Sequence, residues 1–573
     1  MAPVEIPTLH RMLGVIDHRG PDECGYFRDS RAAIGNVRLS IIDLAGGQQP
    51  MHNEDESLWV VFNGEIFNYI ELRKDLELQG HRFYTRSDTE VLVHLYEEYG
   101  PEFVRHLNGQ FAIALWDTRR ERLMLARDRV GIRPLYYAEQ GGALIFGSEV
   151  KALLASGRVE ARLDPKALDQ VFTFWTTLPG RTVFEGVCSL PPGHYLLADE
   201  KGISEHNYWQ LRFPEADNLP EYGNRDEKAE AFRSLLEDAT RLRLRADVTV
   251  GAYLSGGIDS STITSLTHRS GNDMRTFSIA FKNEEYDERI YQDEMVEHLG
   301  TRHERIECDD HDVGRIFPSV IWHTEMPILR TSPAPMFMLS GLVRRNNIKV
   351  VLTGEGADEI LCGYNIFREA KVRRFWAREP DSRSRPQLLK RLYAYIRRLQ
   401  GSSAYIENFF RQGLMDTELP WYSHQIRWEN TSRLKRFFSH ELREALDGYD
   451  GKEELRQTLP AEFNRWTHAA QAQFLEISLF MSGYLLAAQG DRVMAGNSVE
   501  GRFPFLDHRV IEFCNQLHPR LKLNGLREKY LLKKSMEKYL PLNQRTRPKQ
   551  PYRAPITASF LGKELPDYVM ERL

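Results

Sequence analysis

Apolar and polar residues alternate in short runs between residues 32 and 150, and turn-forming residues separate these runs. Alternation over so few residues predicts β-strands that bury one face. Apolar residues with helical spacing interrupt the strands twice, over 69–79 and 89–99. The pattern predicts a two-layer α+β domain dominated by antiparallel strands. The predicted strands cover residues 33–34, 39–42, 58–62, 111–116, 123–126, 135–137 and 144–147.

The pattern changes after a polar stretch, residues 213–224, which we interpret as linker. An amphipathic helix is predicted over 228–243, and apolar strands then alternate with helical segments. Such alternation predicts an α/β domain whose parallel sheet binds ligands at the carboxyl ends of its strands. From about residue 365 the pattern is helical. The predicted strands of this half cover residues 248–254, 276–281, 303–306 and 349–353.

These changes of pattern predict the domain organisation. We expect a first domain over residues 1–205, a linker over 206–225 and a second domain over 226–573.

The strand that ends near Leu254 leads through Ser255-Gly256-Gly257 into a predicted helix that starts at Ile258. A strand, a glycine turn and a helix N-terminus direct free N–H groups at an anion, so the turn is a candidate phosphate site. Asp259 would repel a bare phosphate, but it suits a site in which the carboxylate holds Mg²⁺. An ordinary helix cap after a strand gives the same local pattern.

Three acidic residues, Glu355, Asp358 and Glu359, follow the strand at 349–353, between glycines. Carboxylates at the end of a parallel strand are candidates for metal binding or proton transfer. The alternative is a helix whose first turn is acidic because this suits the helix dipole.

Polar clusters also accompany the strands of the first domain. Arg38 could bind a carboxylate, Glu65 and Asp88 could bind an ammonium group, and the amides of Asn63 and Gly64 could form an oxyanion hole. Together they would suit glutamine, an amino acid with a cleavable side-chain amide. Separately, each cluster is also explained as a turn, a strand-edge charge or a helix cap.

Composition narrows the function classes. A net charge of −5 and a pI near 6.4 give no nucleic-acid or membrane signature. The five cysteines are scattered and odd in number, which argues against a disulfide framework or a zinc site and favours the cytoplasm. No secretory signal precedes the first domain, and the apolar stretch 474–489 contains Glu476 and is expected to be a core helix.

From about residue 9 to 200 the chain resembles the glutaminase domain of asparagine synthetases, which are class II amidotransferases. The motifs that carry the resemblance are, in order, HRGPD, RLSIID, QPM, NGEIFNY, SDTE, ARDRVGIRPLYY and SEVKALL. SGGIDSS resembles the PP-loop of ATP pyrophosphatases. Together with GEGADE, EGRFPFLD and RPKQPY it is similar to the synthetase domain of the same family. The resemblance implies an Ntn-hydrolase-like sandwich followed by a PP-loop domain with a helical C-terminal part.

The resemblance also implies site residues. Asp259 and Asp358 would hold Mg²⁺, Glu355 would act as base or steering group, and Lys529 would neutralise the departing pyrophosphate. Arg330 could clamp a substrate carboxylate, although a surface arginine explains it as well. The implied glutamine site comprises Arg38, Leu39, Ser40, Ile41, Ile42, Asn63, Gly64, Glu65 and Asp88. The implied ATP site comprises Leu254, Ser255, Gly256, Gly257, Asp259, Ser260, Ile279, Thr353 and Gly354.

One departure concerns the glutaminase nucleophile. In the family the mature chain begins at a cysteine followed by a short apolar strand, whereas this sequence begins Met1-Ala2-Pro3 and meets the pattern near Leu9. Cys24 has no free α-amino group to act as base. As written, the chain is therefore expected not to hydrolyse glutamine by the family mechanism. Either the start of the sequence is shortened, or the domain is a natural remnant that has lost its nucleophile. The glutamine-binding residues Arg38, Asn63, Gly64, Glu65 and Asp88 are all retained, which favours a shortened start.

The resemblance implies ATP-dependent amidation of a carboxylate through an acyl-adenylate, with aspartate and asparagine as the default pair. Nitrogen would come from glutamine in the intact family and from free ammonia in a chain without the cysteine. The alternatives are an amidotransferase for another carboxylate, a β-lactam-synthetase-like intramolecular amide former and a nucleotide-binding pseudoenzyme scaffold. The expected partners are small molecules, with no nucleic acid and no membrane, and a homodimer is a hypothesis from family analogy.

Overall fold

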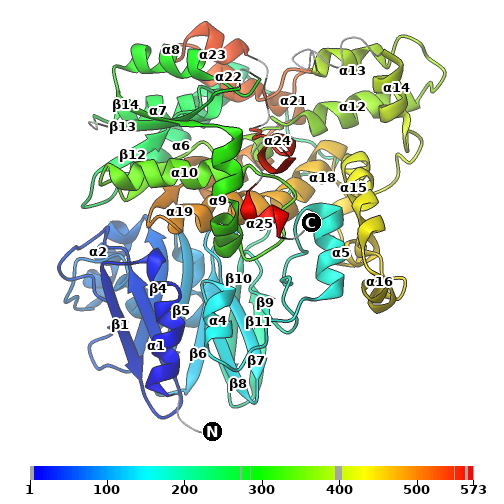
Figure 1. Cartoon of the computed structure of the whole chain (residues 1–573). Coiled ribbons are helices and arrows are strands. Elements are labelled where there is room, and N and C mark those ends of the chain that lie inside the picture. Colours follow the sequence, from blue (N-terminus) through cyan, green and yellow to red (C-terminus); the bar gives the residue numbers. More distant parts are fainter. Residues whose placement is uncertain are drawn as a thin grey trace.

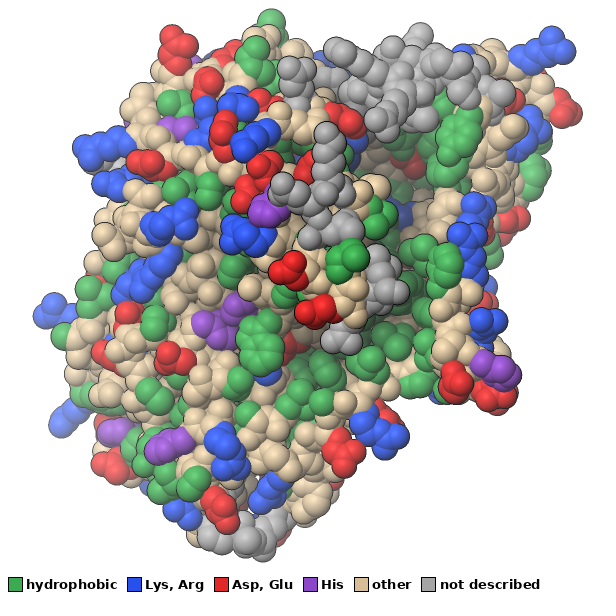
Figure 2. Space-filling view, viewed as in Figure 1, with side chains coloured by type: hydrophobic (Ala, Val, Ile, Leu, Met, Phe, Trp, Pro, Cys, Tyr) green, Lys and Arg blue, Asp and Glu red, His purple; other side chains and the backbone are tan. Residues whose placement is uncertain are grey.

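The computed structural model describes residues 5–271, 274–283, 285–393, 403–547, 549–550, 552–561 and 566–571. Figure 1 shows the strand-rich N-terminal half, in blue to cyan, below the C-terminal half, in green to red. Acidic and basic side chains are intermixed over both halves on the face seen in Figure 2, so no single sign of charge dominates this face.

A six-stranded antiparallel sheet forms the centre of the N-terminal half, in the order β11-β10-β6-β5-β4-β3. Helices α2 (Tyr69–Gln79) and α3 (Val91–Tyr99) share an apolar core with one face of this sheet. Two smaller sheets, β1-β2 and β8-β7-β9, share a core with its other face. The predicted α+β sandwich is confirmed. The strands are β1 (Glu23–Arg28), β2 (Ala33–Arg38), β3 (Met51–His52), β4 (Leu58–Ile66), β5 (Gly109–Asp117), β6 (Arg122–Arg127), β7 (Tyr136–Gln140), β8 (Ala143–Gly147), β9 (Cys188–Ser189), β10 (His194–Asp199) and β11 (Gly202–Asn207).

Two predictions of strand position are wrong. Residues 39–42 form a loop, because Asp22 and Arg38 occupy its backbone groups: Ser40 N donates to Asp22 Oδ2 at 2.8 Å, and Arg38 Nη2 donates to Ile42 O at 2.8 Å. Strand β4 continues to Ile66 and pairs with β5 along its whole length. Asn63, Gly64 and Glu65 therefore lie inside a strand instead of following one.

The C-terminal half contains a five-stranded sheet in the order β14-β13-β12-β15-β16, and every pair in it is parallel. The predicted parallel α/β sheet is confirmed. Its chain order reverses beside β12, which creates a crevice between the carboxyl ends of β12 and β15. The fifth strand, of only three residues, was not predicted. The strands are β12 (Val250–Tyr253), β13 (Arg275–Phe281), β14 (Arg302–Cys308), β15 (Val350–Leu352) and β16 (Glu500–Arg502).

Helices cover this sheet and continue the chain beyond it (Figure 1). The predicted helix at 228–243 corresponds to α6 (Arg225–Leu242), and α7 (Ile258–Arg269) follows the glycine turn. The predicted core helix at 474–489 lies in α18 (His468–Leu475) and the π-helical stretches η6 (Glu476–Leu485) and η7 (Ala487–Asp491). No helix in the described ranges has the length and apolar character needed to cross a membrane.

The predicted linker lies between β11 and α6, where the chain forms no helix or strand. Trp209 in this segment donates from Nε1 to Glu512 Oε1 at 2.8 Å. This hydrogen bond connects the segment to the C-terminal half. The exact domain limits at residues 205 and 226 stay a prediction.

Candidate active site

The crevice between β12 and β15 opens into a cavity of about 740 Å³. This volume lies within the range of about 300–1,000 Å³ that is usual for small-molecule sites. Most of the predicted ATP residues line it, whereas Gly256 and Gly257 do not. The lining residues of that set are Leu254, Ser255, Asp259, Ser260, Ile279, Thr353 and Gly354.

The first turn of α7 and the turn after β15 touch each other through their backbones. A Cβ atom added at Gly354 would lie 2.6 Å from Ser260 N and 2.7 Å from Asp259 C. Only glycine permits this approach, which sets the distance between the two halves of the crevice.

Replacing Gly354 by alanine is therefore expected to push the two turns apart. We expect a loss of about 1–3 kcal/mol in the free energy of unfolding, the usual cost of overpacking, together with weaker ATP binding. Urea unfolding and ATP titration measure the two effects. Gly14→Ala is the control, because nothing lies within 4 Å of the added Cβ, and equal behaviour of both variants would contradict the prediction.

Two aspartates and two lysines form the charged centre of the cavity. Lys529 Nζ lies 2.5 Å from Asp259 Oδ2 and 2.6 Å from Asp358 Oδ1. Lys549 Nζ lies 2.6 Å from Asp358 Oδ2 and 3.7 Å from Asp259 Oδ2. Burial alone would raise the pKa of Asp358, but Lys529 and Lys549 hold it below its ordinary value. The cluster therefore presents both negative oxygen ligands and positive charge at the strand ends.

Glu355 lies beside this cluster and lines the cavity. Burial, opposed by Lys549 and reinforced by the charges of Asp358 and Asp259, raises the pKa of Glu355 to about 7. A carboxyl group with that pKa exchanges a proton readily near neutral pH, as a general base requires.

Arg330 also lines the cavity, from the connection between α9 (Asp310–Thr324) and α10 (Pro333–Arg345). Its guanidinium stacks on Trp175, with 4.1 Å from Cζ to the ring centroid. No carboxylate of the described residues lies within ion-pair distance of Arg330, and burial lowers its pKa to about 10. Arg330 is thus a cation held in place by an aromatic ring and available to an anionic ligand.

Sequence reasoning missed two residues of this cavity. Trp175 belongs to the predicted first domain, yet it lines the cavity and donates from Nε1 to Thr431 Oγ1 at 2.7 Å. Lys549 belongs to the RPKQPY motif, but the sequence did not predict that it lies in the ATP-side cavity. A lysine within a motif is a weak signal. Pro548 and Pro551 of that motif lie outside the described residues.

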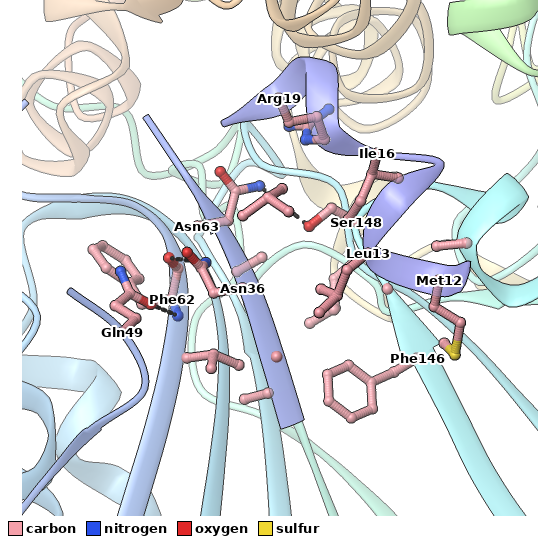
Figure 3. A pocket seen from close by; sticks show the side chains of 18 of the residues that line it. Met12, Leu13, Ile16, Arg19, Asn36, Gln49, Phe62, Asn63, Phe146 and Ser148 are labelled. Atoms are coloured by element: carbon pink, nitrogen blue, oxygen red, sulfur yellow. Dashed lines mark hydrogen bonds between the residues drawn. The ribbon is translucent and has the colours of Figure 1, made fainter. Parts of the chain in front are cut away.

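A second cavity, of about 530 Å³, lies in the N-terminal half. Eight of the nine predicted glutamine residues line it, and Ser40 is the exception. In Figure 3, Met12, Leu13 and Ile16 form an apolar side opposite Gln49 and Phe62. Asn63 donates from Nδ2 to Ser148 Oγ at 3.4 Å in the middle of this cavity. Residues 1–4 lie outside the described residues.

The charged residues of the second cavity already have protein partners. Arg38 uses three of its five N–H donors on Glu23 Oε2, Ile42 O and Asp43 O. Burial raises the pKa of Asp88 to about 6. Glu65 Oε1 pairs with Arg502 Nη2 at 2.9 Å, whereas its buried Oε2 has no hydrogen-bond partner among the described residues. Glu65 Oε2 can therefore still accept a hydrogen bond from a ligand, and burial raises the pKa of Glu65 well above its ordinary value.

A buried chain of ion pairs connects the second cavity to the C-terminal half. Its members alternate in sign, and each neighbouring pair lies between 2.7 and 2.9 Å apart. The N-terminal half supplies four members and the C-terminal half three. In order they are Glu65, Arg502, Glu500, Arg133, Asp491, Arg19 and Glu149.

Both halves of the chain match known protein families. The profile of the asparagine synthase family matches residues 231–573, and that of the glutamine amidotransferase domain matches residues 2–209. Glutamine-hydrolyzing asparagine synthetase 1 of Bacillus subtilis is 31% identical over 565 residues, which cover 98% of this chain and 86% of that protein. The amidase chyE of Penicillium rubens is 32% identical over 573 residues, covering 93% and 83%.

The antiparallel sandwich, the parallel sheet and their two cavities define an amidotransferase that uses ATP. The chain belongs to the asparagine synthase family and is a carbon–nitrogen ligase of that type. Membership of the family as a whole, however, does not identify the carboxylate that is amidated.

Proposed function

We propose that this protein converts aspartate to asparagine through an aspartyl-adenylate. The observation that carries the proposal is the charged cluster of Asp259, Asp358, Lys529 and Lys549 at the strand ends, with Arg330 lining the same cavity. The cluster suits the phosphates of ATP, and Arg330 suits a carboxylate of the acceptor. Holding both reactants in one cavity replaces a bimolecular encounter by an oriented one.

The donor set also fits Mg²⁺. Asp259 Oδ1 is buried and has no hydrogen-bond partner among the described residues, as expected of an oxygen reserved for a cation. Asp259 and Asp358 would hold the ion. When bound, it would neutralise phosphate charge during adenylation.

The residues of the cavity would then act in two steps. In the first, the acceptor carboxylate attacks the α-phosphorus, and Lys529 and Lys549 stabilise the pyrophosphate that leaves. In the second, the nitrogen of ammonia forms a bond to the acyl carbon, the bond from that carbon to the AMP oxygen breaks, and Glu355 takes the released proton. The products are the amide, AMP and pyrophosphate.

We infer two sources of nitrogen. A chain that carries the family's N-terminal cysteine would take nitrogen from glutamine, and a chain without it would use free ammonia. The second cavity reaches Ala495, Val499 and Glu500, and the first reaches Leu485 and Gln489. This one segment therefore touches both cavities, which supports a route for ammonia along it.

The proposal is tested by pyrophosphate release with ATP, Mg²⁺ and aspartate, given either ammonium or glutamine. We expect asparagine to accumulate with ammonium. Release with ammonium but not with glutamine would show that the polypeptide as given lacks a working glutaminase. If no pyrophosphate is released with either nitrogen source, aspartate is not the acceptor.

Replacing Glu355 by glutamine tests the second step. Glutamine cannot take up the proton, so the ammonia-dependent rate is expected to fall about 10²-fold, within the usual range for a general base. Because the base must be deprotonated, the wild-type rate per free ammonia should rise with pH through about 7. The profile of the variant should be flat there, and an unchanged pH dependence would contradict the role.

Another carboxylic acid is the second candidate acceptor. Phe409, Phe480 and Tyr484 also line the cavity, and this apolar lining is more than aspartate needs. The similarity to an amidase named chyE is compatible with such a substrate. A screen of carboxylic acids for pyrophosphate release distinguishes the two candidates.

We also infer a cytoplasmic location, which the five free cysteines support because a reducing compartment keeps thiols free. A homodimer, expected from family analogy, stays a prediction.

A further inference from the structure

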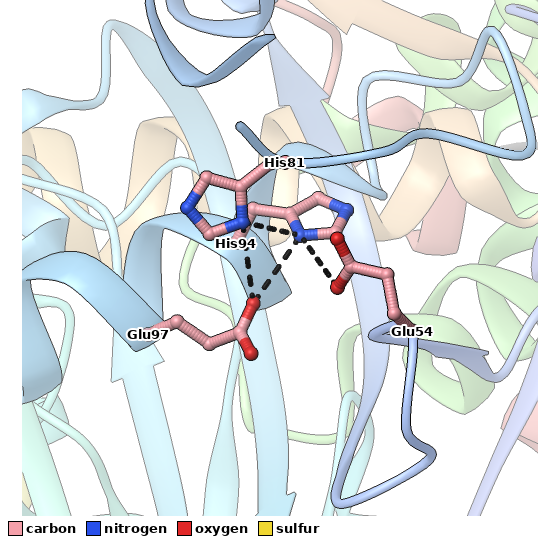
Figure 4. A group of neighbouring side chains, drawn as sticks. All are labelled: Glu54, His81, His94 and Glu97. Atoms are coloured by element: carbon pink, nitrogen blue, oxygen red, sulfur yellow. Dashed lines mark hydrogen bonds and ion pairs between the residues drawn. The ribbon is translucent and has the colours of Figure 1, made fainter. Parts of the chain in front are cut away.

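Four side chains outside both cavities converge on one point at the surface of the N-terminal half. Figure 4 shows Glu54 from the connection between β3 and β4, His81 from the connection between α2 and α3, and His94 and Glu97 from α3. One ligand atom from each of the four lies within 4.8 Å of the others. These four residues are called the His₂Glu₂ cluster below.

The distances within the cluster are those of a coordination shell. His81 Nδ1 and His94 Nδ1 are 3.2 Å apart. Glu97 Oε2 lies 3.5 Å from His81 Nδ1 and 3.3 Å from His94 Nδ1. Glu54 Oε2 lies 3.5 Å from His94 Nδ1. Four ligands at the zinc distances of about 2.0–2.1 Å in a tetrahedron would be about 3.3 Å from one another.

Three members of the cluster, Glu54, Glu97 and His81, also have a partner on their outer atom. Glu54 Oε1 accepts from Arg82 N at 2.9 Å, and Glu97 Oε1 accepts from Asn53 Nδ2 at 2.9 Å. The backbone and an asparagine side chain thus take the outer oxygens and leave both Oε2 atoms facing inward.

Of the two histidines, His81 has a carboxylate in contact with its outer nitrogen: Nε2 lies 2.9 Å from Glu98 Oε1. The outer nitrogen of His94 has no hydrogen-bond partner among the described residues, and Glu90 Oε1 is 3.7 Å from it. A carboxylate on the outer nitrogen is the usual partner of a metal-binding histidine, because it fixes the tautomer and raises the basicity of the inner nitrogen. Both inner atoms are Nδ1, and both point to the centre.

Burial of the cluster is graded from one side to the other. The His94 side chain is 1% exposed and that of His81 11%, whereas Glu97 and Glu54 are 30% and 40% exposed. The imidazoles thus form the floor, and the carboxylates form an accessible rim through which an ion can enter.

We propose that the His₂Glu₂ cluster binds one Zn²⁺ ion. Two imidazole nitrogens and two carboxylate oxygens at tetrahedral spacing suit zinc, whereas Mg²⁺ and Ca²⁺ prefer shells of oxygen alone. All four positions are protein ligands, so the ion has a structural role and takes no part in amide formation.

The ion would stabilise the chain segments at the edge of the second cavity. It joins the β3–β4 hairpin to α3 and to the segment that precedes α3. Within that segment, Glu90 accepts from Tyr84 N and Thr85 N at 2.7 Å each, and Asp88 lines the cavity. The zinc site therefore lies behind the segment that positions Asp88, independently of the function proposed for the other cavity.

The test uses the full chain, stripped with a chelator and titrated with Zn²⁺. We expect one ion per chain by elemental analysis, and visible absorption bands of tetrahedral Co²⁺ when cobalt replaces zinc. At 100-fold excess over the dissociation constant, zinc should raise the unfolding temperature of a chain of 573 residues by roughly 2 °C.

Three variants assign the ion to the cluster. Glu54→Ala, Glu97→Ala and His81→Ala should each weaken Zn²⁺ binding at least about tenfold and remove the cobalt bands. Glu54 and Glu97 belong to the exposed rim, and His81 is more exposed than His94, so we expect these variants to fold, while the buried His94 is left intact. His106→Ala is the matched control, because His106 is an exposed histidine close to α3 that does not belong to the cluster.

Zinc bound equally by all variants, or no stoichiometric zinc in the wild type, would overturn the proposal. Either result would mean that the cluster consists of histidine–carboxylate contacts and holds no ion. Full binding in the control together with its loss in the three variants would establish the site.

Discussion

Replacing Lys529 by methionine should lower pyrophosphate release about 10³-fold. One preorganised donor to a developing negative charge is worth roughly 10²–10³-fold, and Lys529 in addition separates two carboxylates. Its Nζ is 2.5 Å from Asp259 and 2.6 Å from Asp358, and the side chain is 1% exposed. Without it the two acids repel each other, and the phosphates of ATP lose a positive partner. Pyrophosphate release at saturating ATP measures the loss.

The control for this variant is Lys534→Met in α22 (Tyr530–Ser535), the helix that Lys529 directly precedes. Lys534 pairs at 2.6 Å with Asp226, whose side chain is 82% exposed, so its removal should cost less than about 1 kcal/mol and leave turnover intact. Circular dichroism checks that both variants fold. Turnover within tenfold of wild type in a folded Lys529→Met protein would remove Lys529 from the proposed mechanism.

Replacing Arg502 by methionine should destabilise the whole protein. Arg502 has no exposed side-chain surface and joins Glu65 of the N-terminal half to Glu500. It also donates from Nη1 to the carbonyl oxygens of Arg243 and Arg245, at 3.0 and 2.6 Å. Removing one partner of a buried ion pair leaves an uncompensated charge, which costs about 3–5 kcal/mol. Urea unfolding should show the loss.

The matched control is Arg119→Met. Its ion pair with Asp55 joins side chains that are 70% and 49% exposed, so we expect less than about 1 kcal/mol. Chains with two domains can unfold in two steps, so the two halves must be followed by separate probes. An Arg502 variant as stable as the control would mean that the ion-pair chain contributes nothing to joining the halves.

The strand-turn-helix elements of both halves were predicted well because their signals are local. The run of residues from 250 to 261 contains the apolar strand, the glycines and the helix start within one short window, and the structure has β12 and α7 at that place. The same holds for the helix at 69–79, which matches α2 at both ends.

The errors arose where tertiary contacts override local pattern. Residues 39–42 are apolar and were expected to form a strand, but Ile41 and Ile42 pack instead against Val350 of the other half. Strand β16 has three residues, too few for a periodic signal, and it forms only because β15 offers a parallel edge.

For the sites, the sequence by itself determined the chemical groups: which carboxylates, lysines and glycines are present, and next to which strand ends they lie. Proximity along the chain is enough for this, because a motif spans a few residues whose geometry is local. Only the tertiary structure decided which groups meet. Trp175 reaches the ATP-side cavity, Arg502 pairs with Glu65, and Glu54 meets His94 because packing brings together residues that lie far apart in the chain. Those contacts depend on the burial of apolar surface across the whole molecule, which no short stretch of sequence records.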